Sequence, residues 1–100
     1  MAYEMLVALN VVDEEGYTAY RHGMTPILEQ YGGSFPYDFK IATTLKSEAS
    51  HPLNRVFVIR FADAARKNEF FAHPVYQEVK TRFYHKAVRD TVIISETDSP

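Results

Sequence analysis

Four histidines are the first residues of this 100-residue chain to consider for chemistry, because imidazole can ligate a metal or transfer a proton. No two of them stand at positions i and i+4 of one predicted helix, the spacing at which paired histidines bind zinc in metalloproteases. His51 and His73 each precede a proline, which is typical of a loop or a helix boundary. The chain has no cysteine, so thiolate ligands and thiol catalysis are excluded. We therefore expect no metal site and no cofactor.

Arg60 stands out because it lies within the apolar segment Asn54–Asp63, on a strand face that it shares with valine and alanine side chains. A guanidinium buried there must find a carboxylate or several acceptors. The interpretation we favour is an ion pair with Glu4 or Asp38 at a dimer interface. The alternative is a pocket arginine that holds a substrate carboxylate, which suits its planar fork of donors.

Tyrosines at helical spacing could line a ligand pocket, although most of their rings are expected in the core with the hydroxyl at its rim. Tyr20 and Tyr76 are the candidates for the polar groups of such a pocket, with Arg82 beside the inward helix face. Asn54 and His73 are expected at its mouth. Such phenols could position a planar organic molecule.

These residues must be positioned by strands and helices that the sequence also predicts. Tyr3–Val12 and Asn54–Asp63 have apolar residues at both odd and even positions, which predicts strands covered on both faces in the middle of a sheet. Phe35–Lys46 alternates between apolar and polar residues, which predicts an edge strand. Asp38, in this strand, is predicted to be a solvated charge.

The first helix is predicted to follow Asp13 and to present a stripe of tyrosines and aliphatic residues to the core. Pro26 lies inside this pattern and predicts a kink, or two short helices that meet near Thr25. Gly32 and Gly33 are expected to end the helix, because glycine readily takes the left-handed conformation.

A second helical region is predicted after Asp63, which is placed to cap a short helix over Ala64–Ala72. His73 and Pro74 break that helix and begin the next, whose inward face carries Tyr76 and its helical neighbours Val79 and Phe83. The last strand is predicted from Asp90 or Thr91 to Glu96, and the polar residues 96–100 are expected to fray.

The resulting order of strand, helix, strand, strand, helix, strand predicts an α+β fold with the ferredoxin-like βαββαβ topology. Its four-stranded antiparallel sheet carries both helices on one face. The open face of the sheet needs a cover, and a second copy is the simplest one. We therefore expect residues 1–100 to form a single domain of a homodimer, a dimeric α+β barrel.

Charge and hydropathy narrow the possible partners. The net charge is −2 and the basic residues are dispersed, so the clustered charge of a nucleic-acid-binding surface is missing. No apolar segment is long enough to span a bilayer or to resemble a signal peptide. We expect a cytoplasmic protein that binds neither nucleic acid nor membrane.

Several landmarks together resemble a small bacterial family of unknown function within the dimeric α+β barrel superfamily. They are the segments Gln30–Gly33, Arg55–Phe61 and Phe70–Tyr76, the last followed by a helix that contains Arg82. The resemblance spans roughly the whole chain and implies a homodimer with a small pocket between sheet and helices. The superfamily includes cofactor-free oxygenases, isomerases and haem enzymes, so the resemblance implies no single activity. Where relatives often carry an arginine after the glycines, this chain has Ser34.

Two hypotheses of function follow. In the first, the homodimer binds or converts a small hydrophobic or aromatic acid without a metal; whether it is an enzyme stays open. In the second, the chain is a non-catalytic dimerisation or regulatory module. The first predicts a cavity of about 300 Å³ or more between sheet and helices, and the second predicts a filled core.

Overall fold

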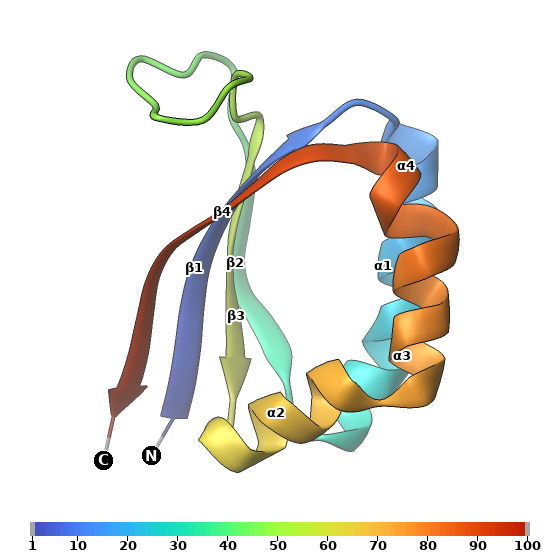
Figure 1. Cartoon of the computed structure of the whole chain (residues 1–100). Coiled ribbons are helices and arrows are strands. Elements are labelled where there is room, and N and C mark those ends of the chain that lie inside the picture. The colour runs from blue at the N-terminus through green and yellow to red at the C-terminus, as the bar shows by residue number, and fades with distance from the viewer. Residues whose placement is uncertain (1, 100) are drawn as a thin grey trace.

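The strands and helices follow one another in the order β, α, β, β, α, β, and the second helical region is divided into several pieces (Figure 1). The computed structural model describes residues 2–99. The elements are β1 (Ala2–Val11), α1 (Glu14–Gln30), β2 (Ser34–Lys40), β3 (Arg55–Phe61), α2 (Ala64–Ala72), α3 (Pro74–Val79), the π-helix η1 (Lys80–Tyr84), α4 (His85–Ala87) and β4 (Val88–Ser99).

The four strands form one antiparallel sheet in the order β2-β3-β1-β4. The two strands with apolar residues on both faces, β1 and β3, are therefore the central pair, as predicted. Their register pairs Tyr3 with Phe61 and Leu9 with Arg55. All helices lie on one side of the sheet (Figure 1). The predicted ferredoxin-like α+β fold is confirmed.

The core lies between the sheet and the helices. Alternate residues of β1 and β3 point into it because successive side chains of a strand face opposite sides of the sheet. The inward stripe of α1 meets them, and Tyr17, Met24 and Leu28 are almost completely buried. The core also contains Met5, Val7, Leu9, Val11, Tyr20, Ile27, Phe57, Ile59, Phe61, Phe70, Tyr76 and Ala87.

Helix α1 begins and ends as the sequence predicts. The carboxylate of Asp13 accepts a hydrogen bond from the Gly16 amide, and Gly32 takes a φ of 70° just past the last turn. Pro26 does not divide the helix, which runs unbroken to Gln30. The Thr25 hydroxyl donates to the Arg21 carbonyl, so a side chain joins the hydrogen bonding of the helix one residue before the proline.

Helices α1 and α3 approach each other closely at Gly23. A Cβ atom at this position would lie 2.8 Å from a methyl carbon of Val79, which is too close for an ordinary contact. The glycine therefore sets the spacing of the two helices that roof the core. Asp63 and His73 cap α2 and α3 through their side chains, and Pro74 occupies the first turn of α3, as predicted.

Strand β2 differs from the predicted edge strand in both length and orientation. It pairs with β3 only from Ser34 to Lys40, and the register shifts between Ser34 and Tyr37. The extra residue in this bulge reverses which face the later side chains point to. Tyr37 consequently pairs with Val58 and points away from the helices, whereas Asp38 points toward them. Asp38 is exposed on the edge strand, as predicted, but the sequence did not indicate its ion pairs with Arg21 and Arg55.

The rest of the predicted strand, residues 41–46, belongs to a loop over residues 41–54. The loop extends beyond the ends of β2 and β3, on the side away from the helices (Figure 1). Its hydrogen bond from the Ile41 amide to the Asn54 carbonyl is the last backbone link next to the hairpin. Leu45, at 91% exposed, has no apolar neighbour to hold it against the sheet.

Strand β4 is longer than predicted. It pairs with β1 from Val88 to Ser99, so the polar residues expected to fray form regular sheet up to Ser99, and Pro100 lies outside the described residues. The backbone hydrogen bonds of β1 stabilise this polar segment even though its sequence lacks an apolar stripe. A register irregularity at Ile94 separates the two halves of the pairing.

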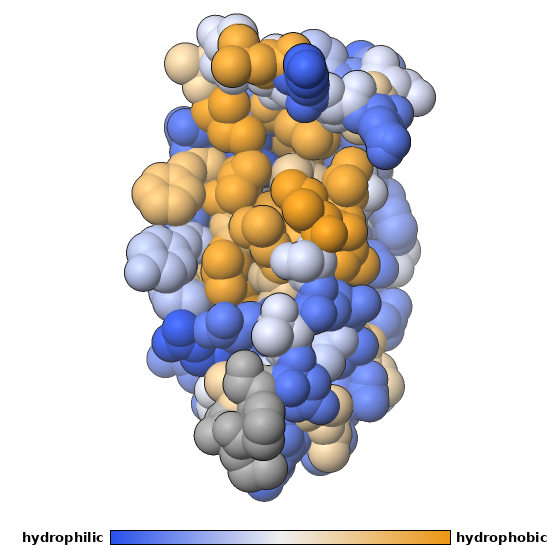
Figure 2. All heavy atoms as spheres, turned by 90° about the vertical axis from the view of Figure 1, so that its left-hand side faces the viewer, coloured by the Kyte–Doolittle hydropathy of each residue, from blue (hydrophilic) through white to orange (hydrophobic). Residues whose placement is uncertain are grey.

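The face of the sheet opposite the helices carries an apolar patch, which Figure 2 shows at the centre of this side of the molecule. We call it the open face. Its large exposed residues Tyr37 and Phe39 stack on each other with ring centroids 6.1 Å apart. Next to them on β3 lie Val56 and Val58, which are only partly buried. Arg60, on the same face, is exposed rather than buried as the sequence suggested, and it pairs with Glu4, one of the two partners expected for it.

Candidate functional site

A cavity of about 790 Å³ lies between the sheet and the helices. Its floor is the helix-facing side of the sheet, and its roof is formed by α1, α3 and η1. Aliphatic and aromatic side chains dominate the lining, with a small set of polar groups among them. The lining includes Met5, Val7, Tyr17, Tyr20, Arg21, Met24, Phe35, Phe57, Ile59, Lys67, Phe71, Tyr76, Gln77, Lys80, Tyr84, His85, Val88, Arg89, Thr91, Ile93 and Glu96.

Two buried phenols from opposite helices meet in this lining. The hydroxyl oxygens of Tyr20, on α1, and Tyr76, on α3, are 2.9 Å apart. Burial raises the pKa of Tyr20 well above 10.0 and also raises that of Tyr76. Both phenols therefore carry their protons, and the pair is a source of hydrogen-bond donation rather than a base.

Further tyrosines surround this pair. The ring of Tyr84, on η1, lies 4.9 Å from that of Tyr20, and its hydroxyl is hydrogen bonded to Thr91 on β4. This bond joins the π-helix to the edge of the sheet. Burial raises the pKa of Tyr84 to about 12. The cavity thus has an aromatic roof that stays uncharged at neutral pH.

Arg21, at one end of the cavity, belongs to a cluster that fastens β2 to α1. Its Nε donates to the Tyr17 hydroxyl at 2.8 Å, and its guanidinium lies 3.8 Å from the centre of the Phe35 ring. Asp38 accepts from both Arg21 and Arg55, with the Arg55 bonds at 2.8 Å. The polar groups of this cluster have their hydrogen-bond partners within the chain, so we assign the cluster a positioning role.

The polar lining is predominantly positive. It contains four lysine or arginine side chains, Arg21, Lys67, Lys80 and Arg89, against a single carboxylate, Glu96. Arg21 is neutralised by Asp38, and the Lys67 ammonium lies 3.8 Å from Glu96. An apolar cavity with surplus positive charge favours a ligand with an apolar body and a negative group.

The structure brings Tyr20 and Tyr76 together in the cavity, as expected of pocket residues, but places the other four candidates elsewhere. Asn54 hydrogen bonds through its side chain to both the amide and the carbonyl of Val11, each at 2.8 Å. His73 caps α3 and does not line the cavity. Arg60 lies on the open face, on the other side of the sheet.

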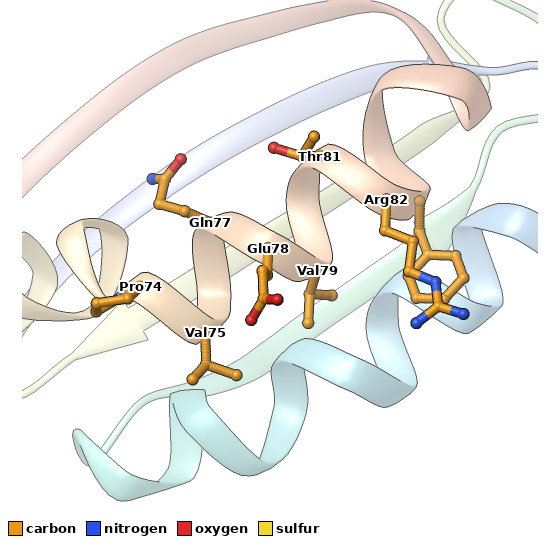
Figure 3. A pocket seen from close by; sticks show the side chains of 8 residues that line it. Pro74, Val75, Gln77, Glu78, Val79, Thr81 and Arg82 are labelled. Carbon is orange, nitrogen blue, oxygen red and sulfur yellow. The ribbon is translucent and has the colours of Figure 1, made fainter.

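Arg82 faces a second hollow, an open groove of about 540 Å³ on the outside of the helices. Figure 3 shows Val75, Val79 and Arg82 projecting from α3 and η1 on the same side, toward α1. Arg82 is exposed and its guanidinium lies over the Phe83 ring. This groove has few polar groups that converge on one point, so we regard the cavity as the candidate site.

The sequence interpretation missed Lys80 and Tyr84. Both lie on the π-helix η1, between α3 and α4. One signal was present: Tyr76, Lys80 and Tyr84 are spaced four residues apart and could have been recognised as one helical face.

Within residues 2–99, no group of three or more histidine, aspartate or glutamate side chains is arranged to hold a metal ion. No helix in this part of the chain combines the length and the apolar character needed to cross a bilayer.

The fold and the cavity define an α+β protein with a ferredoxin-like sheet and a pocket beneath its helices. Within this class, the chain belongs to the family described as domain of unknown function DUF1330, whose model matches residues 2–97. No curated protein gave a significant match.

Solved structures with the same fold cover nearly the whole chain. A protein of unknown function from Rhodopseudomonas palustris is 21% identical and covers 99% of this chain and 82% of its own, with a TM-score of 0.83. A dabb family protein with a ferredoxin-like fold from Mesorhizobium loti is 14% identical, with coverages of 99% and 95% and a TM-score of 0.64.

A dimeric ferredoxin-like protein of unknown function from Jannaschia is also 14% identical, with coverages of 99% and 100% and a TM-score of 0.59. At these identities the likeness establishes the fold and leaves the activity open.

Proposed function

We propose that this protein is a cytosolic homodimer whose sheet–helix cavity binds, or converts without a metal, a small hydrophobic or aromatic acid. The observation that carries the proposal is the cavity itself. Its volume of about 790 Å³ is ample for a small organic molecule, and its lining is aromatic and aliphatic with a surplus of positive charge. The rival hypothesis of a purely structural module predicts a filled core, and a cavity of this size counts against it.

The open face supports the homodimer. Tyr37 and Phe39 are more than half exposed there, beside the partly buried Val56 and Val58. A contiguous apolar patch of this kind on a sheet typically marks an interface. A second copy offers the same patch and can cover it symmetrically. Structures with the same fold from Jannaschia and from Bacteroides fragilis are described as dimeric.

The protonated phenols indicate which chemistry the cavity could support. Tyr20 and Tyr76 can donate hydrogen bonds to a carbonyl or carboxylate oxygen, which stabilises negative charge on that oxygen. Their raised pKa values make them poor bases at neutral pH. If the protein is an enzyme, these groups polarise or orient the substrate, and proton abstraction requires another residue.

A matched pair of substitutions tests whether ligands occupy the cavity. Ile93 and Ile94 are neighbours on β4 with similar exposure, 51% and 53%, but only Ile93 lines the cavity. Ligand-observed NMR with phenylacetate, cinnamate and naphthoate should detect binding to the wild type. Ile93→Trp places an indole in the cavity and should abolish that binding, whereas Ile94→Trp should retain it. Failure of all three acids to bind a folded dimer, or unchanged binding to Ile93→Trp, would contradict the proposal.

A further inference from the structure

Lys80 differs from most of the other cations around the cavity because it has no carboxylate partner. Arg21 and Lys67 are paired with Asp38 and Glu96, but no acidic side chain among residues 2–99 lies within ion-pair distance of the Lys80 ammonium. Arg89 is also without such a partner, but it is exposed, whereas Lys80 is partly buried. An anionic ligand in the cavity would supply the missing counter-charge and could form a charge-assisted hydrogen bond with the ammonium.

The position of Lys80 on the π-helix places it between two cavity tyrosines. Tyr76 precedes it by four residues and Tyr84 follows it by four, and all three side chains line the cavity. The ammonium lies 6.0 Å from the centre of the Tyr84 ring. A π-helical segment is rare and recurs at functional sites, where it changes the direction of side chains. Here it continues one cavity-lining face from α3 to α4.

The Tyr20–Tyr76 pair has a hydroxyl proton that no group among residues 2–99 accepts. Two protonated phenols carry two protons, and the single hydrogen bond between them uses one. Neither hydroxyl has another hydrogen-bond partner among the described residues. Because both residues line the cavity, the second proton can be donated to an oxygen atom there.

We propose that Lys80 binds the carboxylate of the ligand and that the Tyr20–Tyr76 pair donates a hydrogen bond to another oxygen of the same molecule. The inference rests on the proposed ligand-binding function of the cavity and names its ligand class. That class is an aromatic carboxylic acid that carries a further hydroxyl or carbonyl oxygen. The aromatic body lies among the side chains of the roof and floor.

Three probes with the same ring system separate these contributions: naphthamide, naphthoate and hydroxynaphthoate. Isothermal titration should show that wild-type protein binds naphthoate more tightly than the uncharged naphthamide. Lys80→Met should weaken naphthoate binding about tenfold, because a charge-assisted hydrogen bond is lost, and leave naphthamide binding unchanged. Lys80→Arg should keep the preference. Lys86→Met is the matched control, because Lys86 is exposed and does not line the cavity.

The hydroxyl group that distinguishes hydroxynaphthoate from naphthoate tests hydrogen bonding by the phenol pair. Wild-type protein should bind hydroxynaphthoate about threefold more tightly than naphthoate, a gain typical of one neutral hydrogen bond. The double variant Tyr20→Phe/Tyr76→Phe removes both hydroxyl protons and should remove that gain without changing naphthoate binding. Tyr31→Phe serves as the control, because Tyr31 lies outside the cavity lining. Circular dichroism establishes that each variant is folded.

The outcomes distinguish this inference from the proposed function. If no probe binds the wild type, both fail together. Equal affinity for naphthoate and naphthamide, or a preference that survives in Lys80→Met, overturns the role of Lys80 and leaves the cavity as a binding site. A hydroxyl gain that survives in Tyr20→Phe/Tyr76→Phe overturns the role of the phenol pair.

Discussion

Arg55 donates two hydrogen bonds of 2.8 Å to the carboxylate of Asp38 on the neighbouring strand, through Nε and Nη2. Arg21 reaches the same carboxylate from α1, with its Nη1 atom 3.2 Å from Oδ2. One carboxylate thus joins β2, β3 and the helix that roofs the cavity. The side chain of Asp38 is 28% exposed, so this junction lies at the margin of the core rather than in open solvent.

Asp38→Asn should lower the free energy of unfolding by about 1–2 kcal/mol at neutral pH, because charged hydrogen bonds are lost at a partly exposed site. Partial burial opposes ionisation of Asp38, but the hydrogen bonds and charges of Arg55 and Arg21 outweigh it and hold the pKa of the carboxyl below 3.8. Urea unfolding of both proteins measures the difference. Asp98→Asn is the control, because Asp98 is exposed on β4. It should change the free energy of unfolding little.

The pH dependence of that difference follows from the lowered pKa. Native Asp38 binds a proton less readily than unfolded Asp38, so its contribution is complete above the unfolded value of 3.8. The contribution is lost as the pH falls through the lower, native pKa. The gap between wild type and Asp38→Asn should therefore be constant near neutral pH and shrink below 3.8. A gap that widens in acid would contradict the ion-pair interpretation.

Asn54→Ala should destabilise the fold by about 2 kcal/mol, because it leaves the amide and the carbonyl of Val11 without their partner. Asn68→Ala, at an exposed position of α2, is the control and should change stability by less than about 0.5 kcal/mol. Thermal unfolding measures both. Folded Asn54→Ala should bind naphthoate as tightly as the wild type does. A loss of binding without loss of the fold would show that Asn54 is a pocket residue.

Val58→Glu should convert the dimer into a folded monomer, because two carboxylates would be buried against each other across the open faces. Val75→Glu is the matched control: the same substitution at a position that is 48% exposed beside the outer groove should leave the dimer intact. Sedimentation velocity at micromolar concentration distinguishes the two. A wild-type protein that sediments as a monomer would refute the proposed dimer.

The features that the sequence predicted correctly depend on residues close together in the chain. The central strands β1 and β3 were recognised by their apolar residues on both faces, Asp63 was recognised as a cap by its place before a helix, and α1 was expected to follow Asp13. Gly32 was expected to end α1 and takes the left-handed conformation. Tyr20 and Tyr76 were placed on inward helix faces and both line the cavity, while their role in binding a ligand stays a prediction.

The errors arise where pairing between distant segments overrides a local pattern. Alternation in β2 predicted one polar and one apolar face, but the bulge before Tyr37 turned Asp38 inward and Tyr37 outward. Pairing with β1 likewise made regular strand of the polar end of β4. Arg82 was expected beside the inward helix face, but Lys80 lines the cavity and Arg82 does not.

By itself, the amino-acid sequence determined the order of the elements, the two inner strands and the inward helix faces, because hydrophobic periodicity and capping act over a few neighbouring residues. Tertiary structure alone decided the bulge in β2, the partners of Asp38 and the absence, within residues 2–99, of a carboxylate at ion-pair distance from Lys80. These depend on the register in which segments far apart in the chain meet, and the energies that select one register are spread over the whole sheet and its helices. The shape and charge of the cavity therefore emerged only when the chain was folded.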